Sequence, residues 1–274
     1  MKSGAVEGLP YSLSRWTDIP ASKWDWFKDR LQAGSMRAFD QRECLSDMWS
    51  LDPKDVYGLV FWTKDPRNLI NDRKLLEPYP VVVHLTLTGW EEAELNAPKL
   101  SQGLLLLQET VEAFGPSRVV WRFSPIPQLD ILDILDRFSA IARVASDVGL
   151  RKVYTVFLQE NDLMPESRPQ HRRRVVLEAM ASAADQYGIT VELCRDDADI
   201  SKAAVDGRLC NLKLGVCEDG RIFGGRPPVM DCGCALAIDP FTINEACSMG
   251  CQYCYAANRS LSPHKRNTTL KAIS

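Results

Sequence analysis

Short apolar runs alternate with longer helical segments along most of the chain, and this alternation constrains the fold more than any other feature. The helical segments are amphipathic, and several end at a glycine, which is a common helix stop. The apolar runs are rich in β-branched and aromatic residues, as strands are, and span 11–14, 58–63, 81–88, 118–123, 152–158, 189–194 and 235–243. Strands that alternate with helices form βαβ units around a parallel sheet. The sequence therefore predicts an α/β protein, a partial (β/α) barrel of about six to seven parallel strands.

Polar side chains gather on one face of two neighbouring predicted strands. The third strand places His84, Thr86 and Thr88 on one face, and the fourth carries Arg122 among apolar neighbours. In parallel barrels the chemistry lies at the carboxyl ends of the strands. A polar face on a central strand favours a ligand-filled interior, although a hydrogen-bonded core accounts for His84 equally well. We expect a binding site at this edge of the sheet.

Composition and charge narrow the class of protein. The chain has 274 residues and a net charge of −3, and a single core of this size needs no disulfides. No apolar run approaches the ~18 residues of a membrane span, and the first residues lack the apolar core of a signal peptide. We therefore expect a cytoplasmic protein without a membrane partner, and the acidic balance disfavours a nucleic-acid partner. Reduced cysteines in such a protein favour metal binding or catalysis over disulfides.

Three cysteines stand close together near the C-terminus, where Cys247, Cys251 and Cys254 form a C-x3-C-x2-C motif. Thiolates at this spacing on a tight loop can face one point and ligate iron. Electron-transfer clusters and structural zinc sites use four protein ligands, so three cysteines leave one iron open for a cofactor or substrate. The alternative is a zinc knuckle that takes its fourth ligand elsewhere, for example from His264.

The stretch CSMGCQYCYA, in which Tyr253 precedes the last cysteine, resembles the cluster loop of the radical S-adenosylmethionine (SAM) superfamily. This resemblance implies a [4Fe–4S] cluster on the three cysteines, with SAM on the open iron. In that superfamily an electron from the cluster cleaves SAM to methionine and a 5′-deoxyadenosyl radical, which abstracts hydrogen from a substrate. The resemblance also implies an electron donor such as a flavodoxin or a ferredoxin.

The position of the motif departs from that superfamily, because the motif follows the last predicted strand rather than the first. In a ring of strands, 235–243 can stand beside 11–14, so we expect a circularly permuted barrel. Asp18, in the loop after the first strand, is then the candidate to bind the SAM amino group. The alternative is that Asp18 caps the helix that starts near Pro20. The predicted SAM-binding residues are Asp18, Thr86, Thr88, Arg122 and Tyr253.

A longer set of motifs resembles the DUF1848 family, a bacterial family of unknown function. The shared stretches, in this order, are LSRWTDIP, VFWTKDP, LTLTGW, WRFSPI, CGC and the terminal cysteine motif. Members of that family look like radical SAM proteins with the cluster moved to the C-terminus. The chain departs from the family pattern at Trp16 and at 244–246, which affects the substrate that the resemblance implies and leaves the cluster untouched.

Residues 195–234 break the alternation and are predicted to form a long loop rich in glycine and cysteine. Such loops inside a compact domain are usually functional or disordered. An auxiliary [4Fe–4S] cluster or a zinc ion would hold the loop together, and Cys217 is an extra cysteine. The cysteines that match the family and are predicted to bind this second metal are Cys194, Cys210, Cys232 and Cys234.

The predicted organisation is one compact domain with three parts. Residues 1–194 form the barrel body, 195–234 the cysteine-rich loop, and 235–274 the final strand with the cluster motif. The sequence predicts a radical SAM enzyme with an unidentified substrate, and a radical enzyme acting on DNA or a nucleotide is a variant of this prediction. The alternative is a non-catalytic iron–sulfur or zinc protein, such as a redox-sensing nucleic-acid binder. Its support is the basic run at 168–174, although such runs are more often a solvated helix face.

Overall fold

The computed structural model describes residues 1–40, 45–127, 130–158, 170–194, 211–240, 247–254 and 256. One ten-stranded sheet organises it, in the order β3-β2-β10-β1-β4-β5-β6-β7-β8-β9. Every neighbouring pair from β10 to β9 is parallel, which gives eight parallel strands, and β2 and β3 extend the sheet with antiparallel pairs. The predicted α/β fold is confirmed. Over the described residues the sheet is open, with β3 and β9 at its edges.

Seven of the eight parallel strands fall in the predicted runs. The exception is β9, which lies in residues predicted as loop, and the antiparallel strands β2 (Ser35–Asp40) and β3 (Leu45–Ser50) were not predicted either. All three mix polar with apolar residues, so their strand signal is weak. The parallel strands are β1 (Tyr11–Leu13), β4 (Leu59–Thr63), β5 (Val81–Thr86), β6 (Val119–Ile126), β7 (Lys152–Phe157), β8 (Thr190–Cys194), β9 (Leu212–Gly215) and β10 (Ile238–Asp239).

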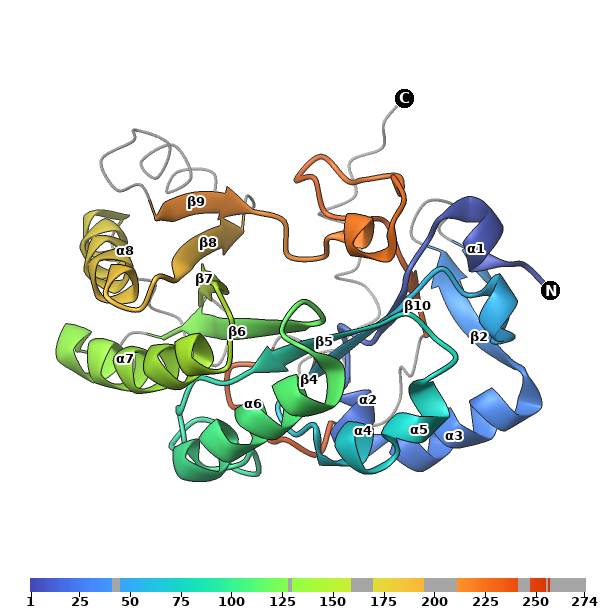
Figure 1. Cartoon of the computed structure of the whole chain (residues 1–274), viewed down its shortest axis with the longest axis horizontal. Coiled ribbons are helices and arrows are strands. Elements are labelled where there is room, and N and C mark those ends of the chain that lie inside the picture. The colour runs from blue at the N-terminus through green and yellow to red at the C-terminus, as the bar shows by residue number, and fades with distance from the viewer. Residues whose placement is uncertain are drawn as a thin grey trace.

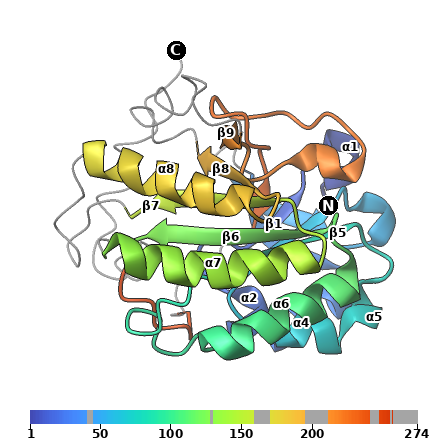
Figure 2. The same ribbon diagram turned by 60° about the vertical axis from the view of Figure 1, so that its left-hand side comes forward.

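The longer helices fall in the helical segments that the sequence predicts, which end at Gly34, Gly115, Gly149 and Gly188. They are α3 (Trp24–Ala33), α6 (Leu100–Phe114), α7 (Ile131–Asp147) and α8 (Gln170–Asp185). Figures 1 and 2 show α6 and α7 along the same side of the sheet. No helix of the described residues is long and apolar enough to cross a membrane. The short elements are α1 (Gly4–Glu7), α2 (Ile19–Ser22), α4 (Arg67–Asn71), α5 (Arg73–Leu76) and the 3-10 turns η1 (Pro53–Asp55) and η2 (Gly220–Phe223).

The two faces of the sheet differ in chemistry. On the helix side, fully buried apolar side chains such as Phe61, Trp121 and Val153 form the core. On the opposite side, which we call the inner face, the strands carry Ser12, Trp62, His84 and Arg122. There, the rings of Trp62 and His84 stack with 4.3 Å between their centroids, and the Trp62 indole donates to Ser12 Oγ at 2.9 Å. Polar side chains on one face and apolar side chains on the other therefore alternate along β5 and β6, as the sequence predicts.

The segment after β9 covers the amino-terminal part of the inner face. Cys217, Ile222 and Phe223 of this segment pack against the apolar cluster formed by Val82, Val120 and Tyr154. It is the orange stretch that crosses the sheet in Figure 1. The described residues of the predicted cysteine-rich loop thus pack against the inner face of the sheet.

The last described strand stands beside the first, as the permuted barrel requires. β10 pairs in parallel with β1, and Tyr11 lies opposite Ile238. Just beyond this pair, Ser14 Oγ donates to Asp239 Oδ1 at 2.5 Å and the Arg15 backbone N–H donates to Oδ2 at 3.2 Å. The prediction that the strand at 235–243 joins the strand at 11–14 is therefore confirmed.

The burial of the Asp239 carboxyl makes stability depend on pH. Burial raises the pKa of Asp239 to about 7, although hydrogen bonds from Ser14 and Arg15 lower it. In the unfolded chain an aspartate titrates near ~3.9. Between about pH 4 and pH 7 the Asp239 carboxyl is protonated in the folded protein and ionised in the unfolded chain. The free energy of unfolding therefore falls as the pH rises from about 4, and this loss is complete once the pH has passed through about 7. In the wild type we expect this group to lower the free energy of unfolding by about 1.4 kcal/mol per pH unit across that window. In Asp239→Asn we expect this contribution to be absent.

Urea denaturation of the wild type and the variant at about pH 5 and pH 7 measures this change. Asp25→Asn is the matched control, because Asp25 is exposed on α3 and should leave the pH dependence as it is. The same pH dependence in Asp239→Asn as in the wild type would contradict the prediction.

Candidate functional site

The cysteine motif docks on the loop that follows β5. Cys251 forms an isolated antiparallel bridge with Glu94, and the Gln252 N–H donates to the Ala93 carbonyl at 2.9 Å. The Asn96 N–H donates to the Met249 carbonyl at 3.1 Å, and its side chain donates to the Ser248 carbonyl at 2.7 Å. The motif is therefore held like a short added strand at the carboxyl end of the sheet.

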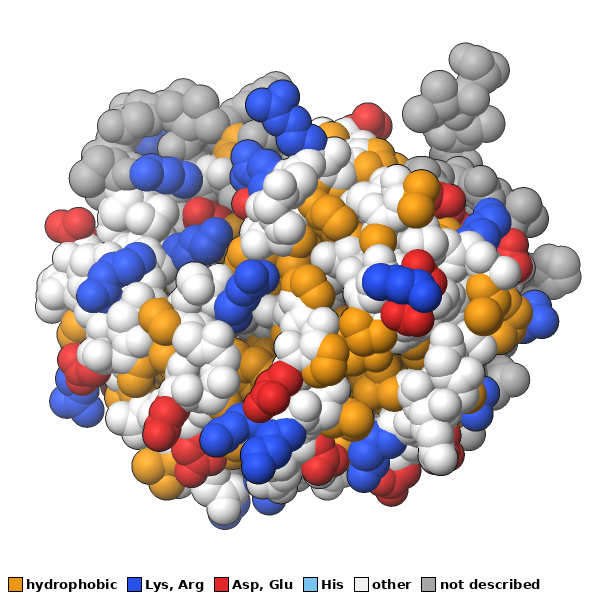
Figure 3. All heavy atoms as spheres, turned by 45° about the vertical axis from the view of Figure 1, so that its right-hand side comes forward, with side chains coloured by type: hydrophobic (Ala, Val, Ile, Leu, Met, Phe, Trp, Pro, Cys, Tyr) orange, Lys and Arg blue, Asp and Glu red, His pale blue; other side chains and the backbone are white. Residues whose placement is uncertain are grey.

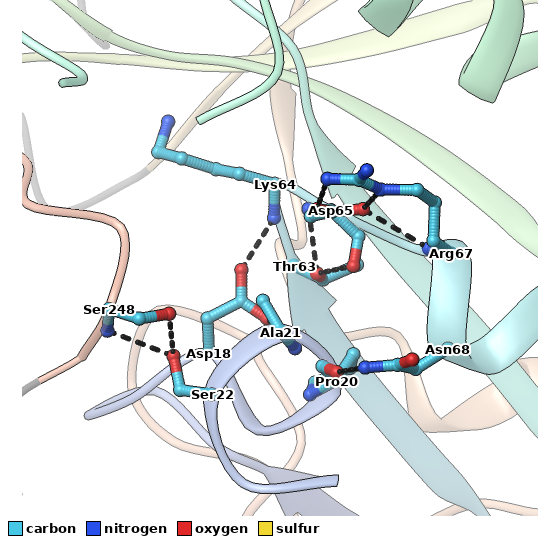
Figure 4. Close-up of polar contacts among 10 residues, drawn as sticks. All are labelled: Asp18, Pro20, Ala21, Ser22, Thr63, Lys64, Asp65, Arg67, Asn68 and Ser248. Carbon is cyan, nitrogen blue, oxygen red and sulfur yellow. Dashed lines mark hydrogen bonds and ion pairs between the residues drawn. The ribbon is translucent and has the colours of Figure 1, made fainter. Parts of the chain in front are cut away.

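Helix α2, which follows β1, holds the motif from the other side. Ser22 Oγ lies 2.7 Å from Ser248 Oγ and accepts from the Ser248 N–H at 2.9 Å, and these contacts are drawn in Figure 4. Ser22 Oγ also donates to Cys247 Sγ at 3.8 Å. The motif thus lies between the loops that follow β1 and β5.

Gly250 allows the tight turn between the first two cysteines. Its φ of +64° lies in the left-handed region, which residues with a side chain rarely adopt. A Cβ at this position would also lie 3.1 Å from Asn96 Nδ2, which anchors the loop. The glycine therefore lets the motif reverse direction against its support.

Glu94 is the centre of the polar contacts around the motif. Its side chain is 5% exposed, and Oε1 accepts from Lys64 Nζ at 2.8 Å and from Thr88 Oγ1 at 2.6 Å. The Tyr253 hydroxyl donates to the same oxygen, and Lys64 Nζ lies 5.7 Å from the centroid of the Tyr253 ring. Burial, helped by the charge of Glu94, raises the pKa of Tyr253 far above its ordinary value, so the hydroxyl stays a donor. Glu94 therefore ties β4, β5 and the motif together.

The three thiols of the motif are partly buried, and no disulfide joins them. Burial raises the pKa of Cys251 to about 12, and the charges of Glu94, Cys254 and Cys247 add to this while Lys64 opposes it. Without a metal the Cys251 thiol is therefore protonated near neutral pH, whereas a bound metal would deprotonate it.

Among the described residues, no group of three His, Cys, Asp or Glu side chains is placed to hold a metal ion. Binding of a cluster or of zinc by the three cysteines therefore stays a prediction. His264, the alternative fourth ligand to zinc, lies outside the described residues.

Asp18 caps α2 and ties it to β4. Its Oδ1 accepts from the Ala21 N–H at 3.0 Å and its Oδ2 from the Lys64 N–H at 2.7 Å (Figure 4). Burial raises the pKa of Asp18 to about 6, although these hydrogen bonds lower it. The capping role is therefore present in the structure. Contact with SAM stays a prediction, and Asp18 lies one helical turn from Ser22, which touches the motif.

The other predicted SAM-binding residues lie in two places. Thr88 and Tyr253 share Glu94, as described above. Thr86 and Arg122 are opposite each other on β5 and β6, and the Arg122 guanidinium lies 4.8 Å from the centroid of the Trp62 ring. Arg122 Nη1 is buried without a hydrogen-bond partner among the described residues. This nitrogen is available to an anionic group on the inner face.

The sequence did not single out several residues that shape the site. Glu94 stands in an acidic run, WEEAE, in which nothing marks one glutamate as buried. Arg15 pairs with Glu218, which is buried in the segment after β9. Burial raises the pKa of Glu218, and Arg15 counteracts that effect. Only contacts between distant segments reveal this ion pair.

The predicted auxiliary cysteines are described in part. Cys210 lies outside the described residues, and Cys194 is in β8 with its side chain not described. Cys234 is buried, and its Sγ lies 3.1 Å from Sγ of Cys217. Hydrogen bonding with Cys217 and burial raise the pKa of Cys234 far above its ordinary value, and the charge of Cys232 adds to the effect. The structure thus places Cys217, which the sequence left as extra, beside a predicted ligand.

The basic run at 168–174 begins α8 in its described part. Arg174 pairs with Glu178 at 2.8 Å, one turn along the helix, and the Arg173 guanidinium lies 5.5 Å from the centroid of the Phe157 ring. The pair of Arg174 with Glu178 is typical of a solvated helix face, the more frequent role of such runs. Figure 3 turns α8 away from the viewer, and on the face that it draws basic and acidic side chains are interspersed as well.

Comparison with known proteins gives one family. A family model described as "Domain of unknown function (DUF1848)" matches residues 11–256. No curated protein matches. Among solved structures, a Proteus mirabilis N-acetylneuraminate lyase is 14% identical with a TM-score of 0.34, and the match covers 63% of each chain, less than two thirds of the lyase. A putative alpha-L-fucosidase from Bacteroides thetaiotaomicron is 12% identical with a TM-score of 0.35, and the match covers 78% of this chain and 87% of that one.

The contacts of Glu94 predict how its loss affects the motif. Glu94→Gln keeps the shape but removes the charge that accepts from Lys64, Thr88 and Tyr253. Hydrogen bonds to charged groups contribute about 1.5–3 kcal/mol each, so we expect the motif to open at least ~10-fold more often. In metal-free protein, iodoacetamide should then modify Cys251 at least ~10-fold faster, as measured by mass spectrometry of its peptide.

Glu92→Gln is the control for this experiment. Glu92 is exposed on the same loop and pairs with Arg137 at 2.6 Å, away from the cysteines. We expect the wild-type rate of modification in this variant. If both variants modify Cys251 at the wild-type rate, Glu94 does not hold the motif in place.

Proposed function

The chain belongs to the DUF1848 family, as its motifs predicted, and we propose that it is a radical SAM enzyme whose [4Fe–4S] cluster is bound by Cys247, Cys251 and Cys254. The observation that carries this proposal is the docking of the motif between the loops that follow β1 and β5. That edge is where parallel barrels place their chemistry. The motif reaches it from the end of the chain because β10 stands beside β1.

When bound, a cluster with one open iron supplies the electron that cleaves SAM reductively, drawn in turn from a donor such as a flavodoxin or a ferredoxin. The chain's part is to hold the motif and shield it. Glu94 fixes the motif through Tyr253, and Lys64 balances the buried charge. The partial burial of Cys251 limits access of water and oxygen to its sulfur. These are the tasks a protein performs for such a cofactor.

We assign SAM binding to the inner face and the strand ends next to the motif. Arg122 offers a buried donor to a carboxylate, and Thr86 lies opposite it. Tyr253, which belongs to the motif, and Thr88 both donate hydrogen bonds to Glu94. Asp18 takes part through the position of α2, since both of its oxygens already accept backbone hydrogen bonds.

A second metal, either a [4Fe–4S] cluster or zinc, is proposed for the cysteine-rich segment. The proposed ligands in the described residues are Cys232 and Cys234, and Cys194 and Cys210 complete the set. Cys217 lies within 3.1 Å of Cys234, so a metal at Cys234 would have Cys217 beside it. An auxiliary cluster would relay electrons or bind substrate, whereas zinc would fix the segment against the barrel.

Anaerobic reconstitution followed by dithionite and SAM tests the proposal. We expect 5′-deoxyadenosine from the wild type and at least a ~100-fold loss in Cys251→Ser, because the cluster loses one of its three thiolates. Glu92→Gln is the control, because Glu92 is exposed and pairs with Arg137 away from the cysteines, and it should keep the activity. Iron and zinc analysis tests the second site, since about four irons and one zinc per chain would select zinc over a second cluster.

One result would contradict the proposed enzyme activity. A reconstituted wild type whose EPR signal does not change with SAM, and that forms no 5′-deoxyadenosine, would be a non-catalytic iron–sulfur protein.

A further inference from the structure

A cavity of about 660 Å³ lies on the inner face, at the end of the sheet opposite the cysteine motif. Its walls are the first residues of β4 to β7, the turns before β6 and β7, and the segment 216–222. The volume is in the range of small-molecule sites. Neither the cysteine motif nor any predicted SAM-binding residue lines it.

Three lining residues form a row across neighbouring strands. His84 on β5 lies opposite Val120 on β6, and the register of β6 with β7 continues the row towards Lys152. Strands are about 4.8 Å apart, so the ends of this row are roughly 10 Å apart. The middle is apolar, because Val82 and Val120 are both buried in the same small cluster. The row therefore offers a polar group at each end of an apolar floor.

The His84 end lacks a hydrogen-bond partner. The side chain is 2% exposed, and its Nδ1 has no partner among the described residues. Burial lowers the pKa of His84 well below its ordinary value, and the positive charges of Arg122, Lys152 and Arg15 add to this while Cys217 opposes it. The imidazole is therefore neutral. A buried polar atom left unpaired costs about 1–3 kcal/mol, which a bound polar group would offset.

The Lys152 end carries an ammonium with donors to spare. Its side chain is 44% exposed, its Nζ donates to the Tyr154 hydroxyl at 3.2 Å, and Glu192 lies at 4.0 Å. An ammonium has three N–H donors, so a further acceptor can bind at the mouth of the cavity.

The other cations of the lining already have partners. Arg221 makes two hydrogen bonds to Asp219, at 2.7 and 2.8 Å. Arg151 donates to the Ser146 carbonyl at 2.9 Å, at the carboxyl end of α7. Lys152 has only a longer ion-pair contact, 4.0 Å to Glu192, and keeps donors for a ligand. The mouth therefore suits a single negative charge better than the multiple charges of a phosphate.

We propose that this cavity binds an organic monocarboxylate with an apolar body and a hydrogen-bonding group at its far end. The carboxylate lies at Lys152, the body lies between Val120 and the segment 216–222, and the far group reaches Nδ1 of His84. The site does not depend on the proposed SAM chemistry, because it shares no residue with the cysteine motif.

Calorimetric titration of the full chain with three probes tests the site. The probes are 3-(4-hydroxyphenyl)propionate, its amide, and 3-phenylpropionate. We expect the hydroxylated acid to bind best. The amide should bind at least ~10-fold more weakly because it lacks the charge that Lys152 binds, and 3-phenylpropionate ~3- to 10-fold more weakly because it leaves His84 unpaired.

Two variants should each remove one of these preferences. Lys152→Gln should make the acid and its amide bind equally, and His84→Phe, which preserves a ring to stack on Trp62, should make the phenol and phenyl acids bind equally. Lys213→Gln is the control for charge, since Lys213 is exposed on β9, and should keep the wild-type preferences. Cys251→Ser should bind all three probes as the wild type does, which separates this site from the proposed function.

Specific results would overturn the proposal. They are equal binding of the acid and its amide by the wild type, absence of binding at millimolar concentration, and an unchanged preference for the acid in Lys152→Gln. The comparison of phenol with phenyl acid on the wild type needs no variant, so the His84 contact stays testable even if His84→Phe fails to fold.

Discussion

The buried carboxylate of Glu94 is the interaction on which the cysteine motif depends. A buried charge is costly unless it is paired and hydrogen-bonded, and Glu94 meets both conditions only when three separate segments come together. Lys64 arrives from the end of β4, Thr88 from the end of β5, and Tyr253 from the motif. The backbone contacts hold the motif alongside the loop after β5, and the contact of Tyr253 with Glu94 anchors it to the strand ends. Removing any one partner would leave the carboxylate incompletely paired, so the motif and the strand ends form one unit.

A second buried carboxylate joins the two ends of the chain in the same way. Asp239 on β10 accepts from Ser14 and from the backbone of Arg15, both just after β1. The guanidinium of Arg15 also pairs with Glu218, which belongs to the segment that covers the inner face. Three elements that are distant in sequence therefore meet at one polar cluster. Such networks contribute more to a unique arrangement than to stability alone, and here they specify which strand stands beside β1.

The sequence could predict elements with strong local signals and could not predict contacts that depend on distant segments. The β-branched runs identified seven parallel strands. The expectation that the strands form a ring predicted that β10 lies beside β1. Strands β2, β3 and β9 are missed because their composition is mixed and their pairing partners stabilise them. The role of Glu94 is hidden in an acidic run because burial is a property of the folded chain. Cys217 lies close to Cys234 because the neighbouring backbones pair, with the Ala235 N–H donating to the Glu218 carbonyl at 2.8 Å, a contact that only the folded chain reveals.

The two sites proposed above share the polar inner face of one sheet. Trp62, His84 and Arg122 form a layer across β4, β5 and β6, with the cysteine motif beyond one side and the cavity on the other. Two buried atoms of this layer, Nη1 of Arg122 and Nδ1 of His84, have no partner in the described residues. Buried polar atoms are usually hydrogen-bonded, so a ligand that pairs with either atom would offset the cost of burying it. The indole of Trp62 contacts both side chains and holds these two polar groups in one layer.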